Sequence, residues 1–361
     1  MKFLVSIFFS VFLATISFAQ MKPDTSKKVH YLAIPVLFKA PETGWAYGLS
    51  SSASFKTTHY SDTLTRTSVI TALGIFTQRQ QNSQALDATI YFPKEKYILY
   101  FQSSHSYFPD NFWGIGAETK DSNLEKYAYA QLNISGHIKR KIYKNLFAGF
   151  IADYQNVYQV NYQKNGIFDT TAFSGKQKYA DLGFGVSLSY DTRNSSFWPT
   201  KGMFMQGKYI HYNHQFGSTY SFNNLNAEIR FFKSVIKNHI IAMQLFNNFS
   251  DGEVPLRSLS SLGGINNLRG FYQGRYKDNS MYSAIVEYRA HLFWKIGACV
   301  FGGLGNVYHQ ITDSNFAKAK YSFGGGLRLQ ILEKEKMNLR FDYGYSDKYN
   351  NGFYFTIGEC F

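Results

Sequence analysis

The sequence predicts an all-β fold, a transmembrane β-barrel of sixteen antiparallel strands, from three observations. A secretory signal opens the chain, strand-length segments of alternating polarity follow one another to its last residue, and the links between them are mostly short and long in turn. A closed barrel suits such a chain, because closure pairs the backbone polar groups inside a lipid bilayer. We therefore expect the protein in a bacterial outer membrane.

The first residues have the form of a cleaved signal peptide. Lys2 supplies a positive charge, and the run from Phe3 to Phe18 carries no charge and ends beside small residues suited to cleavage. The alternative is a transmembrane anchor, which is less favoured because it needs about 20 apolar residues. We expect residues 1–19 to be removed, residues 20–30 to form a short periplasmic segment without a domain of its own, and residues 31–361 to form the barrel.

The composition fits a wall with one wet face. Mean hydropathy is −0.27, yet aromatic residues make up 18% of the chain and 29 Gly stand against 7 Pro. This balance is typical of strands that face lipid on one side and a polar lumen on the other. The net charge of +14 is scattered among strands and turns. We assign it to anionic lipid headgroups rather than to nucleic acid.

Period-two patterns of apolar residues mark the strands. In the segment from Asp181 to Tyr190 the apolar residues fall on one side and the Asp, Gly and Ser residues on the other. In the same way Glu287, Arg340 and Asp342 fall opposite apolar stripes, which predicts that they face the lumen. The sixteen predicted strands are 31–39, 44–57, 66–79, 83–92, 96–106, 125–140, 144–161, 176–191, 201–213, 219–233, 237–249, 280–291, 295–309, 317–331, 335–347 and 352–361.

The lengths of the links predict the topology. From a periplasmic N-terminus, tight links such as 93–96 fall at the periplasmic end, and the longest links, 107–124, 162–175 and 250–279, fall outside. The link 58–65 is the exception, being long on the short side. An even number of strands returns the C-terminus to the periplasm.

The final strand carries an aromatic stripe. Four residues share one parity and are expected to face lipid: Phe353, Phe355, Ile357 and Phe361. A C-terminal strand of this kind resembles the recognition signal that outer-membrane barrels present to their assembly machinery. The resemblance implies that these residues form a C-terminal assembly signal.

The two cysteines are too few for a disulfide framework. The predicted register puts Cys299 on the thirteenth strand and Cys360 on the sixteenth, roughly 14 Å apart. A disulfide needs Cα atoms within about 7 Å. We therefore expect two free thiols.

The long link between the eleventh and twelfth strands contains the run SLGGINNLRGFYQGRYKD. It resembles the loop-six signature of the BamA/TamA surface-antigen superfamily of outer-membrane assembly factors, whose core is an aliphatic residue followed by Arg-Gly-Phe or Arg-Gly-Tyr. Here that core is Leu268, Arg269, Gly270 and Phe271. The stretches 33–48, 190–202 and 281–289 resemble further parts of the family, and the family barrel also has sixteen strands.

The sequence departs from the family pattern in two ways. Members usually carry tandem POTRA modules ahead of the barrel, and none is expected here. Members also tend to place an Asp on strand thirteen, facing the loop-six Arg, where this chain has Gly303. The partner of Arg269 must therefore differ from the usual one.

The chemistry of Arg269 predicts a wall carboxylate as its partner. A guanidinium offers five donors in a rigid fork suited to capturing a carboxylate. We expect loop six to fold into the lumen with Arg269 paired to Glu287 or Asp342, a choice that the sequence leaves open. The other inward acids, Asp181 and Glu228, lie on more distant strands. The alternative is a solvated surface loop.

No catalytic or metal-binding arrangement is evident, so we expect neither an enzyme nor a cofactor. The nine His are scattered without partners at ligand spacing. The resemblance implies an assembly or translocation factor that works with a partner supplying periplasmic modules, and with other assembly proteins or client barrels. Its working part would be the seam between the first and last strands, weakened by Pro35 and Gly358. The alternative function is a passive channel or porin for small solutes.

Overall fold

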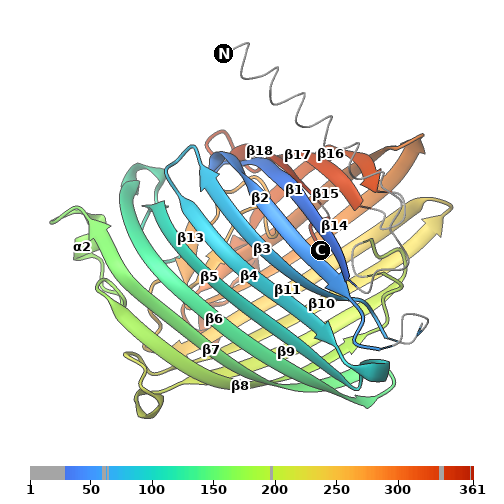
Figure 1. Ribbon diagram of the computed structural model, residues 1–361. Coiled ribbons are helices and arrows are strands. Elements are labelled where there is room, and N and C mark those ends of the chain that lie inside the picture. Colours follow the sequence, from blue (N-terminus) through green and yellow to red (C-terminus); the bar gives the residue numbers. More distant parts are fainter. Residues whose placement is uncertain (1–28, 59–61, 63–64, 196–197, 333–336, 358) are drawn as a thin grey trace.

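The computed structural model shows a closed barrel of sixteen antiparallel strands, as predicted (Figure 1). It describes residues 29–58, 62, 65–195, 198–332, 337–357 and 359–361. The proposed signal peptide, residues 1–19, lies outside this part of the chain, and so does nearly all of the polar segment that follows it.

The observed strands follow the predicted ones closely, with most boundaries moved by a few residues. The barrel strands are β1 (Val29–Ala40), β2 (Gly44–Phe55), β3 (Ser68–Thr77), β4 (Asn82–Tyr91), β5 (Tyr97–Phe112), β6 (Glu125–Tyr143), β7 (Leu146–Tyr162), β8 (Tyr179–Asp191), β9 (Gly202–Tyr212), β10 (Phe222–Ile236), β11 (His239–Gly252), β14 (Ser280–Phe293), β15 (Ile296–Tyr308), β16 (Lys320–Leu332), β17 (Met337–Tyr345) and β18 (Asn351–Ile357). The numbering skips two short strands, which pair with each other inside loop six.

The alternation of β8 shows why these sequences form barrel strands. Val186 and Leu188 are 58% and 53% exposed and face outward, while Ser187 and Ser189 are buried on the inner side. Successive side chains of a strand point to opposite faces, so a period-two sequence supplies an apolar outer surface and a polar inner one. β14 follows the same rule, with Val286 outward and Glu287 inward.

The links divide the barrel into two ends. We call the end where β1 begins and β18 finishes the terminal end, and the opposite end the loop end.

The links contain short helical turns, which are η1 (Pro93–Glu95), η2 (Asp121–Asn123), α2 (Ile167–Thr170), η3 (His214–Phe216), η4 (Ile311–Asp313) and η5 (Phe316–Lys318). Among the described residues, no helix is long and apolar enough to cross a membrane.

The loop end is closed by its own apolar core. Long links fold over the barrel mouth, and Phe168 of α2 packs there against Phe112 and Tyr127 of the wall. Val254, Leu256 and other residues of loop six join the same cluster. Loop six is therefore part of the packed interior.

Closure between β1 and β18 is much weaker than any other pairing. Only one residue pair, Lys39 and Phe355, joins these strands among the described residues. β1 pairs with β2 through twelve residue pairs, and the next shortest ladder of the barrel wall, between β17 and β18, has seven. We call the β1–β18 junction the seam. Figure 1 shows β1 in blue beside β18 in red.

Candidate functional site

Loop six, the link between β11 and β14, is an ordered hairpin. Its short strands β12 (Ser260–Leu262) and β13 (Tyr276–Asp278) pair with each other. The tip between them folds back on itself, with the Gly264 amide donating to the Phe271 carbonyl at 3.0 Å. Gly270 has φ +115°, and a Cβ there would lie 3.1 Å from the Tyr345 backbone. Glycine is therefore required beside Arg269, both for its conformation and for the close approach to β17.

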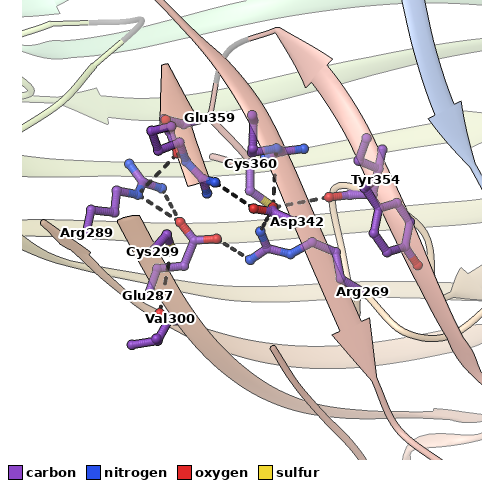
Figure 2. Close-up of polar contacts among 12 residues, drawn as sticks. Arg269, Glu287, Arg289, Cys299, Val300, Asp342, Tyr354, Glu359 and Cys360 are labelled. Carbon is purple, nitrogen blue, oxygen red and sulfur yellow. Dashed lines mark hydrogen bonds and ion pairs between the residues drawn. The ribbon is translucent and has the colours of Figure 1, made fainter. Parts of the chain in front are cut away.

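Arg269 lies between the two acids that the sequence singled out. Its Nη1 is 2.5 Å from Oδ2 of Asp342 on β17, and its Nη2 donates to Oε1 of Glu287 on β14. The guanidinium also stacks on the ring of Phe301, with Cζ 3.5 Å from the ring centre. All three charged side chains are fully buried. One guanidinium thus joins loop six to two strands of the wall (Figure 2).

The surrounding charges form a network that the sequence did not reveal. Three wall arginines share the same carboxylates and a third acid, Glu359. Arg289 contacts Glu287 and lies 3.6 Å from Glu359. Arg328 is 2.5 Å from Asp342 and 3.1 Å from Glu359, and Arg340 is 3.4 Å from Asp342. With Arg269, four guanidinium groups face three carboxylates, so each buried charge has a partner of opposite sign.

Gly303 shows why the acid usual on strand thirteen is absent. A Cβ at this position would lie 2.9 Å from Cδ1 of Leu268 and 3.0 Å from the Ala284 carbonyl. Leu268, fully buried, occupies the space where a wall side chain would point. The acids that bind Arg269 lie on the neighbouring strand β14 and on β17 instead.

A second anchor joins loop six to the opposite side of the lumen. Asp110, near the end of β5, accepts hydrogen bonds from Tyr127 at 3.0 Å and from Tyr272 of loop six at 3.1 Å. Its carboxylate also lies 3.5 Å from Lys277 and 3.9 Å from Arg257, both in loop six. The predicted fifth strand ended at residue 106, which left Asp110 in a link and hid its place on the wall.

The expected lipid-facing position of Phe361 is wrong. β18 ends at Ile357, and Phe361 is 6% exposed and packs against Phe232, Ala242 and Ile285 of the inner wall. Phe353, by contrast, is 67% exposed on the outer face. An extended strand would have put Glu359 on the same lipid face as Phe353. The chain instead turns inward, where Arg289 and Arg328 neutralise the Glu359 carboxylate.

The remaining predicted residues are distributed as follows. Phe355 lies on β18 opposite Lys39 and packs on Phe341, with ring centres 4.5 Å apart. Pro35 lies on β1 opposite Leu49. Gly358 and the side chain of Ile357 lie outside the described part of the chain.

The cysteines are both free thiols in the structure, and both are buried. Cys360 donates to the Ile265 carbonyl of loop six at 3.4 Å. The inward turn of the tail has therefore brought Cys360 against loop six instead of leaving it on the wall.

Comparison with known families agrees with this architecture. A family model described as the Omp85 superfamily domain matches residues 47–361. The chain belongs to the Omp85 superfamily. This membership confirms the family resemblance of the sequence, and it places the protein in the outer membrane.

Solved structures share the Omp85 barrel fold of this chain at low identity. BamA from Haemophilus ducreyi lacking POTRA domains 1–3 has a TM-score of 0.61 at 15% identity, covering 92% of this chain and 70% of that one. CdiB from Escherichia coli has a TM-score of 0.62 at 10% identity, with 92% and 62% covered. CdiB from Acinetobacter baumannii has a TM-score of 0.59 at 11% identity, with 92% and 60% covered. The chain thus spans about six-tenths of the CdiB chains.

Proposed function

We propose that this Omp85 barrel assists the assembly or translocation of outer-membrane proteins, with the seam between β1 and β18 as its working part. The single Lys39–Phe355 pair carries this proposal. Strand edges that lack a ladder partner present free N–H and C=O groups, which template the pairing of an incoming strand. Membership of the superfamily supports a role in this class of process.

We further propose that the barrel works with a partner that supplies periplasmic modules. Every described residue belongs to the barrel wall, its links, loop six or the inward tail. None of these forms a separate unit that could hold an unfolded client. The clients would be other barrel proteins, which enter lipid strand by strand.

A staple across the seam tests whether opening is required. Lys39→Cys together with Phe355→Cys places two thiols at the one paired position, where Cα atoms of opposed residues lie about 4.5–5.5 Å apart and can form a disulfide. In a background with Cys299 and Cys360 replaced by alanine, we expect the oxidised pair to abolish complementation of a depleted strain. Adding reductant should restore it.

The matched control is a staple between strands that stay paired. Ser52→Cys with Thr71→Cys joins β2 to β3, where the native hydroxyl oxygens are 2.9 Å apart. This staple should leave complementation unchanged. Full activity of the oxidised seam staple would overturn the proposal.

A passive channel is the second candidate, favoured by one observation. The lumen holds a polar cavity of about 290 Å³ lined by Asn133, Asp153 and other polar side chains. Ser258 of loop six also lines this cavity. Loop six thus forms part of the cavity wall, and it would have to move for a solute to pass. Depletion followed by an outer-membrane proteome separates the two functions. Broad loss of barrel proteins supports assembly, and loss of uptake of one solute supports a channel.

A further inference from the structure

The seam raises a structural question that its own strands do not answer. One ladder pair contributes little to closure, because a backbone hydrogen bond adds only about 1 kcal/mol net. Something else must hold β1 and β18 together in the closed barrel. The contacts of loop six on the two sides of the seam identify it.

On the β18 side, loop six is bound through Tyr354. This side chain is 1% exposed and lies opposite Asp342, the partner of Arg269. Its hydroxyl accepts a hydrogen bond from the Gly270 amide at 3.0 Å and donates to the Phe271 carbonyl at 3.4 Å. Both bonds join Tyr354 to the backbone of the signature motif. Figure 2 shows Tyr354 beside Arg269 of this motif.

On the β1 side, loop six is bound through Glu42, in the turn between β1 and β2. Its carboxylate Oε1 accepts a hydrogen bond from the Gln273 amide at 2.5 Å, and the side chain is buried. The Glu42 carbonyl accepts from Gln81 at 3.1 Å, which fixes the turn from the β3–β4 side. The same turn packs on β18, because a Cβ at Gly352 would lie 2.4 Å from Cγ of Pro41.

We propose that loop six is a clasp across the seam, binding β18 through Tyr354 and the β1–β2 turn through Glu42. The two sides are held by neighbouring loop residues, Gly270 and Phe271 on one and Gln273 on the other. Release of either contact would free one edge of the seam while Arg269 keeps the loop on the wall. The clasp deepens the proposed function, since it sets when the seam can open.

The charges around Glu42 give the clasp a pH dependence. Burial raises the pKa of Glu42 to about 7, with Asp110 adding to the rise and Arg79 opposing it. The Gln273 amide donates to this carboxylate and Gln81 to the Glu42 backbone carbonyl. The hydroxyl groups of Tyr272 and Tyr354 also interact with the charge of the carboxylate. Opening exposes the carboxyl to water and returns its pKa to about 4.5. The closed state therefore binds the proton more tightly than the open state. The resulting stabilisation of the closed state is fully present below pH 4.5 and is lost as pH rises through about 7.

Spin labels on the outer face measure the opening directly. Tyr47 on β2 and Phe323 on β16 are 50% and 61% exposed, lie near the loop end, and are separated by β1, β18 and β17. Labels are placed at Tyr47→Cys and Phe323→Cys, with both native cysteines replaced by alanine. When the seam is closed they should stand roughly 28 Å apart, because they are separated by four strand spacings and, in the ladder register, by six residues along the strands. The purified full chain is measured in lipid nanodiscs.

Removing either contact should populate a longer distance. Tyr354→Phe and Glu42→Ala are each expected to raise the open fraction about fivefold, the factor for one hydrogen bond. Glu42→Gln keeps an acceptor but cannot ionise, so it should stay closed and lose the rise in opening between pH 5 and pH 8. The matched control is Ser258→Ala, which removes a 2.9 Å hydrogen bond from loop six to Gln155 on β7, away from the seam.

The outcomes separate the clasp from the proposed function. An open fraction unchanged by Tyr354→Phe and Glu42→Ala would overturn the clasp, and so would an equal rise in Ser258→Ala. Each variant is first checked for a folded barrel by its heat-dependent mobility in detergent gels. The spin-label distances are measured without a client protein, so they test the clasp independently of the proposed function. If the variants open the seam as expected but depletion of the protein leaves the outer-membrane proteome unchanged, the clasp stands and only the proposed function is refuted.

Discussion

Arg269 illustrates how a buried cation that is costly to desolvate can fix the position of a loop. Moving a guanidinium out of water carries a large penalty, which two carboxylates and the face of Phe301 offset here. A lysine would offer a single charge centre and could not span Glu287 and Asp342 in the same way. The residue therefore specifies where loop six lies more than it adds to net stability.

Replacing Arg269 by alanine should loosen loop six and leave the barrel folded. Breaking a buried pair costs about 3–5 kcal/mol, less where water can enter, because the stranded carboxylates lose a counter-ion. Arg289, Arg328 and Arg340 remain beside those carboxylates, so the wall keeps its charge balance. We expect faster cleavage within loop six by an added protease, with unchanged heat-modifiable mobility. Arg269→Lys should be intermediate, and cleavage of Arg269→Ala at the rate of the unmodified protein would contradict this role.

At the scale of elements, the inward tail is the clearest departure from a regular strand. Glu359 shares the parity of the lipid-facing aromatic residues, yet its carboxylate reaches Arg328 at 3.1 Å and accepts from Asn338 at 3.1 Å. Phe361 then fills an apolar recess of the inner wall. The tail ties the last strand to the same charge network as loop six.

Cutting the Glu359 contacts should release the tail and expose Cys360. In a Cys299→Ala background we expect Cys360, 8% exposed, to resist maleimide in the folded barrel. Glu359→Ala should raise its labelling rate about tenfold, since a hydrogen bond to a charged group contributes about 1.5–3 kcal/mol. Glu253→Ala, which removes an exposed acid, is the control. Rapid labelling without any substitution would show that the tail is free, and a disulfide to Cys299 in the native protein would contradict both the register and the free thiols.

At the scale of the whole molecule, the barrel is a closed wall around a filled centre. Loop six crosses between the Asp110 anchor and the Arg269 network, and the loop end is sealed by aromatic side chains. A wide open pore does not fit this arrangement. The part of the wall with the shortest pairing is the seam, where one residue pair joins the described residues of β1 and β18.

Deleting residues 262–276 should convert the barrel into a conducting pore. Leu262 and Tyr276 are paired, so the deletion removes the hairpin tip and its ends can be rejoined by a short turn. In planar bilayers we expect small, unsteady conductance from the intact protein and a severalfold larger, steadier one from the deletion. Deleting residues 311–317, where Ile311 and Phe316 are exposed, is the control. A large, stable conductance from the intact protein would instead favour the porin alternative.

The sequence by itself determined the wall. Alternation of polarity along each segment follows from lipid on one face and lumen on the other, a local rule that holds residue by residue, so strand positions and inward residues such as Glu287 and Asp342 were predictable. The contacts between distant segments were decided only in three dimensions. Arg269 binds both acids, Tyr354 and Glu42 meet one loop across the seam, and Glu359 turns inward. Periodicity sets which face a side chain takes, while loop closure and buried charge decide which partner it meets.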